Sequence, residues 1–341
     1  MIEPVAIVGA GPIGLACAIS ARRRGVDPLV FDAGTIAESI ARYPVGMTFF
    51  TTPDRLEIGG HPLVCSGPKP TREEALMYYR SVARVEGLRV RPYTRLLGAT
   101  LTAGGIELRL ARTFGEPREE TLVAERLVLA TGYFGQPSLL EVPGETLPQV
   151  SHYPEEAHRL WGLDVVIVGA KNSAIEQALA AYRAGARVTV VHRGAGLKPS
   201  VKYWLAPDFL NRVKAGEILV RWETVVEAIH PDRVVTRGPT GRAELAADRV
   251  FLLTGYRPDF RLMESIGIEL DRESGRPAHD PATLESNVAG VYLAGSLTAG
   301  RFISEVFIEN GRHDGEKIFG DEASRERAQE LFDRIDRPLG E

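Results

Sequence analysis

Three glycines near the start of the chain, Gly9, Gly11 and Gly14, have the spacing GxGxxG and lie between a short apolar run and a helical stretch that begins at Pro12. In this pattern the first glycine makes a tight strand-to-helix turn, the second lets the backbone approach a pyrophosphate, and the third lets the helix pack against the strand. The helix N-terminus offers N–H groups to phosphates, and Asp32, which ends the next apolar run, can bind ribose hydroxyls. These residues predict a dinucleotide-binding site.

A second copy of this pattern begins at Asp164. The spacing from Gly169 to His192 is 23 residues, the same as the spacing from Gly9 to Asp32. Equal spacing indicates two copies of one βαβ unit, and we expect each copy to bind its own nucleotide.

The second unit differs from the first where a nucleotide would lie. Lys171 and Ala174 replace the second and third glycines, so the pyrophosphate contact is less standard. The strand-end acid is replaced by a cation cluster of His192, Arg193, Lys198 and Lys202. Cations in place of the acid favour a 2′-phosphate, and therefore NADPH over NADH. The alternative is that these cations only form a solvated face.

Three further strands are expected to complete the two units. Apolar strands end at Thr131-Gly132 and at Thr254-Gly255, where a glycine lets the backbone lie close to a bound nucleotide. A last strand ends at Gly295 and is followed by a loop and a helix, and a charged tail from Asp321 to Glu341 predicts a surface helix with a loose end.

Between these junctions the sequence predicts a helix from Thr71 to Gly87, capped by Thr71 with Glu74 three residues on, and then a strand and a β-meander over 89–123. The segment 43–60 is rich in aromatic and hydroxyl side chains and has no regular period. It either packs beneath a long loop or covers a flat ring.

The two cysteines do not form a redox motif. Cys17 lies among apolar residues of the first helix and is expected to be buried, whereas Cys65 lies in a loop. A Cys-x-x-Cys dithiol is absent, and the seven scattered histidines predict no metal site.

The composition is that of a globular protein. A chain of 341 residues suffices for about two domains, and the net charge of −4 gives no reason to expect nucleic acid as a partner. Because no apolar run approaches the ~20 residues of a membrane span and the first strand begins at once, we expect a cytoplasmic protein. The predicted fold is α/β, with two Rossmann-like dinucleotide-binding domains, the second inserted in the first, and a β-meander. We expect the first domain over 1–139 and 258–341 and the second over 140–257.

Together these motifs resemble the two-dinucleotide-binding-domain flavoproteins with the low-molecular-weight thioredoxin reductase fold, over essentially the whole chain. The segments Y-P-V-G-M-T-F-F-T-T-P, G-A-K-N-S-A-I-E, S-V-K-Y-W and F-I-E-N-G-R further resemble bacillithiol-disulfide reductases, which reduce a bacterial low-molecular-weight disulfide with NADPH through FAD. A homodimer is expected by analogy.

The resemblance implies that the first unit holds FAD and the second NADPH. The residues implied for FAD are Gly9, Gly11, Pro12, Ile13, Gly14, Asp32, Met47, Thr48, Thr131, Gly132, Gly295, Ser296, Phe307 and Ile308. Met47 and Thr48 would lie by the isoalloxazine, and the helix end near Phe307 would stabilise the anionic reduced flavin. The residues implied for NADPH are Gly169, Ala170, Lys171, Asn172, Ser173, Ala174, His192, Arg193, Lys198, Lys202 and Gly255.

Two positions depart from the pattern of the resembled proteins. Gly295-Ser296 stands where thioredoxin reductases have Gly-Asp, and Ile13 stands where the bacillithiol-disulfide reductases have Cys. A mixed-disulfide mechanism would then need Cys17 or Cys65.

The sequence predicts hydride transfer from NADPH to flavin and on to a low-molecular-weight disulfide. A small redox protein such as ferredoxin or flavodoxin is an alternative acceptor. A flavin monooxygenase is a further alternative, suggested by His152, which lies between the two nucleotide units in the sequence. A redox-inert flavin-binding scaffold or sensor is another.

Overall fold

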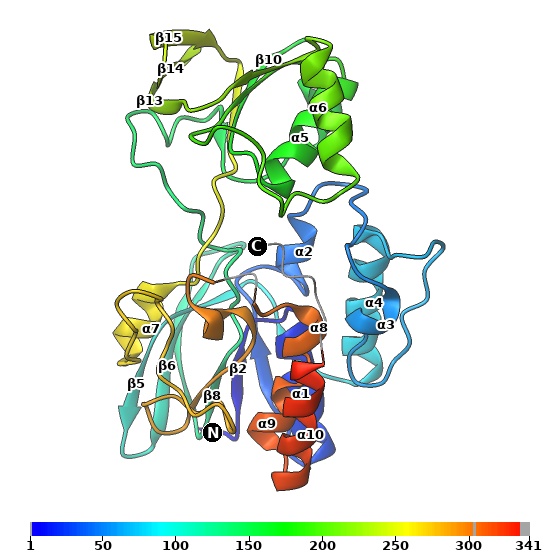
Figure 1. Cartoon of the computed structure of the whole chain (residues 1–341). Coiled ribbons are helices and arrows are strands. Elements are labelled where there is room, and N and C mark those ends of the chain that lie inside the picture. The colour runs from blue at the N-terminus through cyan, green and yellow to red at the C-terminus, as the bar shows by residue number, and fades with distance from the viewer. Residues whose placement is uncertain (1, 303–304, 335–341) are drawn as a thin grey trace. The chain divides into compact units, whose positions relative to one another are not determined.

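The structure, a computed structural model, describes residues 2–302 and 305–334 and divides into two compact units (Figure 1). Within these ranges, unit 1 comprises 2–41, 48–136 and 256–334, and unit 2 comprises 42–47 and 137–255. Unit 2 is therefore inserted into the chain of unit 1.

A parallel five-stranded sheet lies at the centre of unit 1, in the order β17-β8-β2-β3-β4. Its strands are β2 (Ala6–Val8), β3 (Leu29–Phe31), β4 (Arg89–Arg91), β8 (Leu127–Leu129) and β17 (Val291–Leu293). The antiparallel meander beside it consists of β5 (Thr94–Thr102), β6 (Gly105–Arg112) and β7 (Glu119–Ala124), with β1 (Ile2–Glu3) parallel to β7. Strands β2, β3 and β8 are buried on both faces, which explains their uninterrupted apolar sequences.

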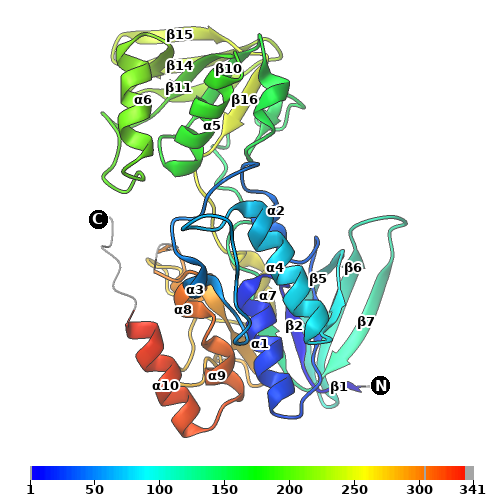
Figure 2. The same ribbon diagram turned by 90° about the vertical axis from the view of Figure 1, so that its right-hand side faces the viewer.

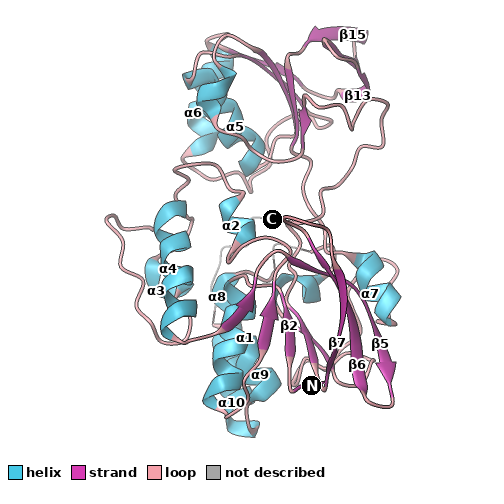
Figure 3. Cartoon of the chain, turned by 180° about the vertical axis from the view of Figure 1, so that it is seen from behind, coloured by secondary structure: helices cyan, strands magenta, loops and turns pink. Residues whose placement is uncertain are grey.

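The helices of unit 1 are α1 (Pro12–Arg23), α2 (Glu38–Ala41), α3 (Pro53–Leu56), α4 (Arg72–Val85), α7 (Phe260–Ile266), the 3-10 helix η2 (Gly295–Ala299), α8 (Ile308–Gly311), α9 (Asp314–Phe319) and α10 (Glu322–Asp333). Helices α1, α9 and α10 lie on the face of the parallel sheet that the meander leaves open, whereas α7 packs against the meander strand β5 (Figure 3). The predicted capping box of α4 is present, because Thr71 and Glu74 each accept the other's backbone N–H. The predicted tail helix is α10; its loose end from 335 onward lies outside the described residues.

Unit 2 repeats the architecture on a smaller scale. Its parallel sheet has the order β12-β11-β10-β16-β9, and α5 and α6 lie on one face with an antiparallel meander on the other (Figure 2). The elements are β9 (Val150–Ser151), the 3-10 helix η1 (Ala157–Leu160), β10 (Asp164–Val168), α5 (Asn172–Arg183), β11 (Arg187–Val191), α6 (Leu205–Lys214), β12 (Ile218–Arg221), β13 (Val225–Ile229), β14 (Arg233–Gly238), β15 (Gly241–Ala246) and β16 (Arg249–Leu252). The meander β13-β14-β15 was not anticipated from the sequence.

The structure thus confirms two parallel Rossmann-like sheets together with an antiparallel meander. In the described ranges, no helix combines the length and apolar character needed to span a membrane. The same residues contain no group of three or more His, Cys, Asp or Glu side chains arranged to hold a metal ion.

Candidate dinucleotide-binding sites

The first glycine motif lies at the carboxyl edge of the sheet of unit 1. Gly9 has φ +115°, a conformation that L side chains rarely adopt, and a Cβ at this position would overlap the carbonyl oxygen of Ala130. A Cβ on Gly14 would overlap the carbonyl oxygen of Gly9. These two positions require glycine, because strand β8 and helix α1 approach the turn without leaving room for a side chain.

Gly11 differs from Gly9 and Gly14, because the space beside it is open and could hold a ligand. Gly11 is the N-cap of α1, and a Cβ there would meet no protein atom within 4 Å. Among the described residues, no side chain caps this helix end and no acid lies in its first turn. The N–H groups of the first turn therefore face open space, and this arrangement fits the pyrophosphate of a dinucleotide.

The carboxylate of Asp32 is oriented by the backbone around it. One oxygen accepts the Ala10 N–H at 2.8 Å and the other accepts the Gly34 N–H at 2.8 Å. Both carboxylate oxygens are thus held by backbone N–H groups of the turn after β2 and of the loop after β3. The position of Asp32 at the end of β3 fits the role predicted from the sequence.

Three segments that are distant in sequence meet at Ile13. A Cβ on Gly295 or on Gly311 would lie 2.7 Å from Ile13 Cδ1, so both glycines pack against this side chain. A Cβ on Gly132 would lie 3.7 Å from Ser296 Oγ, which places the first Thr-Gly junction beside the closing loop. The turn after β2, the end of β8, η2 and α8 therefore form one contiguous region of unit 1.

The start of α8 is held by a residue that the sequence analysis did not single out. Asn310 Oδ1 accepts the Phe307 N–H at 2.7 Å, and Asn310 Nδ2 donates to the Glu305 carbonyl at 2.8 Å. Ile308 begins the helix at this cap. The sequence signal was an Asn three residues after the N-cap Phe307, a weak one because Phe is not a capping residue.

Asp314 is a second residue that the sequence analysis missed. It is only 3 % exposed, and its Oδ2 accepts the Gly295 N–H at 2.7 Å. Burial raises the pKa of this carboxyl from 3.8 to about 7, although the Gly295 N–H and the charge of Lys317 act in the opposite direction. In the sequence it belongs to a charged stretch, His-Asp-Gly-Glu-Lys, which gave no sign of burial.

In unit 2, the corresponding turn has the same backbone form with different side chains. Gly169 has φ +129°, and a Cβ there would overlap the Leu253 carbonyl oxygen. Lys171 is the N-cap of α5, and among the described residues no side chain caps this helix. Ala174 is fully buried against the turn, with its Cβ 3.4 Å from the Cβ position of Gly169, so alanine fits where the first unit needs glycine.

The residues expected to bind the second nucleotide are partly engaged with one another. Asn172 Oδ1 accepts the Lys202 N–H at 2.8 Å, and Asn172 Nδ2 donates to the Ser200 carbonyl at 3.3 Å, so the start of α5 anchors the loop 200–202. Lys202 Nζ donates to Glu176 Oε1 at 2.6 Å. Glu176, which the sequence analysis did not consider, thereby neutralises one cation of the predicted cluster.

The rest of the cation cluster is more exposed. Arg193 and Lys198 are exposed side chains that follow β11. Burial, together with the charges of Arg193 and Lys198, lowers the pKa of His192 below 6.5, so His192 is mainly neutral at pH 7. Arg193 and Lys198 are therefore the exposed cations of the predicted cluster. Ala170 and Ser173 lie on either side of the start of α5, and Gly255 has φ +106° at the end of the segment after β16.

Four further residues singled out in the sequence lie as follows. Thr48 pairs with Thr71 in an isolated antiparallel bridge of unit 1, whereas Met47 belongs to the segment grouped with unit 2. Cys17 is fully buried, as expected, and burial raises the pKa of its thiol, with Asp314 and Glu316 adding to the effect. Cys65 is partly exposed and its thiol donates to the Gly67 carbonyl at 3.1 Å. The structure records both cysteines as unpaired.

Comparison with known proteins agrees with this geometry. The family model described as pyridine nucleotide-disulphide oxidoreductase matches residues 6–295. The chain is 40% identical over 328 residues to bacilliredoxin reductase Bdr of Bacillus subtilis, covering 95% of this chain and 98% of that protein.

Solved structures show the same relationship. The structure of bacillithiol disulfide reductase Bdr (YpdA) from Bacillus cereus is similar with a TM-score of 0.89 and 36% identity, covering 98% of this chain and 100% of that one. The thioredoxin reductase of T. acidophilum shares the fold, with a TM-score of 0.71 at 20% identity over 97% of each chain. Membership in the matched family implies a flavin and a nicotinamide nucleotide. The chain therefore belongs to the pyridine nucleotide-disulphide oxidoreductase family, and within this family it is bacillithiol disulfide reductase-like.

Proposed function

We propose that this protein is an FAD-containing, NADPH-dependent reductase of a low-molecular-weight disulfide of the bacillithiol type. The observation that carries the proposal is the pair of uncapped, glycine-turn helix ends at the carboxyl edges of two parallel sheets, in a chain similar over nearly its whole length to bacillithiol disulfide reductases. Each unit has its own site, so two nucleotides can be bound at once.

The proposed reaction is NADPH + H⁺ + RSSR → NADP⁺ + 2 RSH. A flavin bound in unit 1 would supply the two-electron chemistry that links the hydride donor to the disulfide. The chain's own contribution would be to bind and orient: α1 would offer its first N–H groups to the pyrophosphate, Asp32 would bind ribose hydroxyls, and Asn310 fixes the start of α8. In unit 2, Arg193 and Lys198 would bind the 2′-phosphate.

The cysteines of this chain bear on how the disulfide would be reduced. Ile13 stands where the resembled bacillithiol-disulfide reductases have Cys, and isoleucine cannot exchange with a disulfide. Cys17 is fully buried and the pKa of its thiol is raised, so it is a poor nucleophile. We therefore propose that disulfide reduction proceeds without a protein thiol at this position.

The test is an anaerobic one. The flavin-loaded protein is reduced with one equivalent of NADPH, bacillithiol disulfide is added, and the return of oxidised-flavin absorbance is followed. Reoxidation with release of two thiols per disulfide supports the proposal, and the Ile13→Cys variant serves as a thiol-containing comparison. Failure of the parent to reoxidise, beside rapid reoxidation of Ile13→Cys, would exclude the thiol-independent route.

A second candidate is electron transfer to ferredoxin or flavodoxin, and the absence of cysteine at position 13 favours it. Reoxidation by ferredoxin but not by the disulfide would select it. The assignment of 1–139 and 258–341 to FAD and of 140–257 to NADPH, the homodimer and the cytoplasmic location stay predictions, as does the lesser alternative of a flavin monooxygenase.

A further inference from the structure

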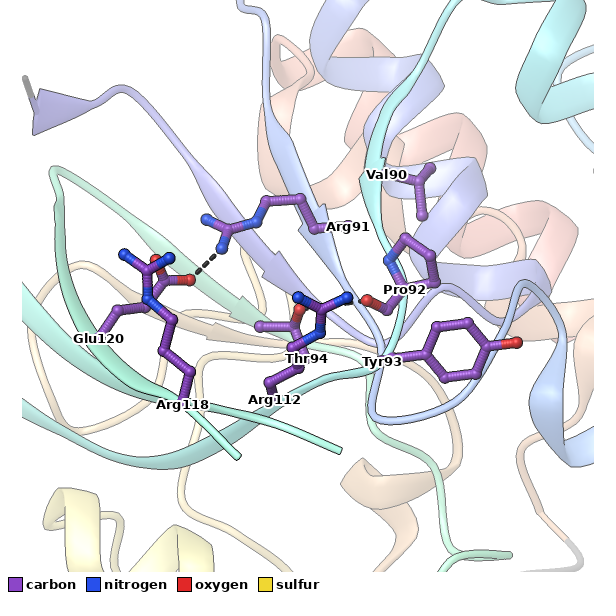
Figure 4. Close-up of a pocket in the computed structure, with 8 residues that line it drawn as sticks. All are labelled: Val90, Arg91, Pro92, Tyr93, Thr94, Arg112, Arg118 and Glu120. Atoms are coloured by element: carbon purple, nitrogen blue, oxygen red, sulfur yellow. Dashed lines mark hydrogen bonds and ion pairs between the residues drawn. The ribbon is translucent and has the colours of Figure 1, made fainter. Parts of the chain in front are cut away.

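A cavity of about 360 Å³ lies in unit 1, outside the glycine turn that begins α1 (Figure 4). Three separate segments contribute arginines to it: Arg91 from the end of β4, Arg112 from the end of β6 and Arg118 from just before β7. We call this cavity the arginine pocket. The Arg91 side chain packs over the ring of Phe31, which belongs to the core between the parallel sheet and the meander, so the pocket lies on the meander side of the sheet.

The arginine pocket carries more positive than negative charge. Among the described residues that line the pocket, Glu120 alone is acidic, and it forms an ion pair with Arg91 (Figure 4). Arg112 uses Nε to donate to the Phe114 carbonyl at 2.8 Å, while Arg118 has an exposed side chain. Among the described residues, neither Arg112 nor Arg118 has a carboxylate within ion-pair distance, so two guanidinium charges are left uncompensated around one cavity.

Backbone hydrogen bonds tie the wall of the arginine pocket to two neighbouring segments. Tyr93 has φ +53°, a left-handed conformation that is uncommon for a bulky residue. Its N–H donates to the Gly34 carbonyl at 2.8 Å and its carbonyl accepts the Thr113 N–H at 2.9 Å. The N–H of Thr94 donates to the Asp32 carbonyl at 2.6 Å. The pocket wall is therefore bonded directly to the loop that carries Asp32.

We propose that the arginine pocket binds the phosphate group of a small phosphorylated molecule. Planar guanidinium forks arranged around a cavity match the tetrahedral oxygens of a phosphate, and charge-assisted hydrogen bonds to it are among the strongest in proteins. The cavity volume lies at the small end of the range of small-molecule sites, which suits inorganic phosphate or a small phosphomonoester. Glu120 orients Arg91 and so leaves Arg112 and Arg118 as the principal phosphate ligands.

The experiment is isothermal titration of the flavin-loaded protein with inorganic phosphate and, separately, with glycerol 3-phosphate. Arg118→Ala is expected to weaken binding of the recognised probe by about tenfold or more, and Arg118→Lys by less, because lysine keeps the charge but not the fork. The control is Arg272→Ala, which removes the same charge from an exposed position of unit 1 that does not line the pocket. This variant should bind like the parent.

The two probes distinguish the source of the phosphate. Equal affinity for both indicates inorganic phosphate, and tighter binding of glycerol 3-phosphate indicates a phosphomonoester; either result supports the pocket if Arg118→Ala weakens it. Three results overturn the proposal: no binding of either probe, equal weakening by Arg118→Ala and Arg272→Ala, or binding only after flavin removal. The last result would assign the cavity to the flavin site itself.

Discussion

The carboxylate of Asp314, at the start of α9, accepts a hydrogen bond of 2.7 Å from the backbone N–H of Gly295, at the start of η2. The bond joins the closing loop to the C-terminal helices. Lys317 on the same helix is also buried and donates to Gln329 of α10 at 2.6 Å, while fully buried Cys17 of α1 faces the same interior. A carboxyl held in this environment makes stability depend on pH.

We predict that Asp314 makes the folded protein less stable as pH rises. Its pKa is raised from 3.8 to about 7, so between these values the native state binds more protons than the unfolded state and the free energy of unfolding falls as pH increases. From pH 5 to pH 8 the parent should lose up to about 3 kcal/mol relative to Asp314→Asn, which keeps an acceptor for Gly295 N–H. Urea denaturation of both proteins at several pH values measures this, and parallel pH profiles would contradict it.

Substitutions at Gly11 and Gly14 should separate ligand binding from folding. A Cβ on Gly11 meets no protein atom within 4 Å, so Gly11→Ala should leave the stability of the flavin-free protein nearly unchanged and weaken flavin binding strongly. A Cβ on Gly14 overlaps the Gly9 carbonyl, so Gly14→Ala should cost about 1–3 kcal/mol even without flavin. Thermal unfolding of the flavin-free proteins and flavin fluorescence titrations check both statements. A destabilised Gly11→Ala would show that the open space is occupied by the chain.

Arg193 and Lys202, two members of the predicted cation cluster, should differ in their effect on coenzyme choice. Arg193 is exposed and predicted to bind the 2′-phosphate, so Arg193→Ala should raise the KM for NADPH by about tenfold and change that for NADH little. Lys202 is already paired with Glu176, so Lys202→Met should have a smaller NADPH-specific effect. Steady-state kinetics with both coenzymes gives the comparison. Equal changes for NADPH and NADH in Arg193→Ala would contradict the 2′-phosphate assignment.

The two thiols should differ sharply in reactivity. Cys65 is partly exposed whereas Cys17 is fully buried with a raised pKa, so a thiol reagent should modify one cysteine in the native protein and two in denaturant. Cys17→Ala should retain disulfide reduction, because we assign no chemistry to this residue. Rapid native modification of Cys17, detected by mass spectrometry of peptides, would disagree with the structure.

The sequence by itself determined the elements whose signals are local. The glycine turns, the capping box of α4 and the repeat of one βαβ unit follow from the spacing of residues within about 30 positions, since turn conformation, caps and periodic burial depend on neighbours in the chain. The meander β13-β14-β15 of unit 2 was not predicted, because its strand β15 is mostly exposed and lacks a clear alternation of apolar residues. The cation cluster was recognised, but the pairing of Lys202 with Glu176 was not.

Only the tertiary structure decided which distant residues meet. Ile13 packs against Gly295 and Gly311, Asp314 reaches Gly295, and Arg91, Arg112 and Arg118 surround one cavity because the register of the sheets and the packing of α9 on α1 bring these segments together. No periodic pattern encodes such contacts, since they depend on where whole elements dock. For the same reason, the charged neighbours of Asp314 in the sequence gave no sign that the carboxyl is buried, whereas burial in the folded protein raises its pKa.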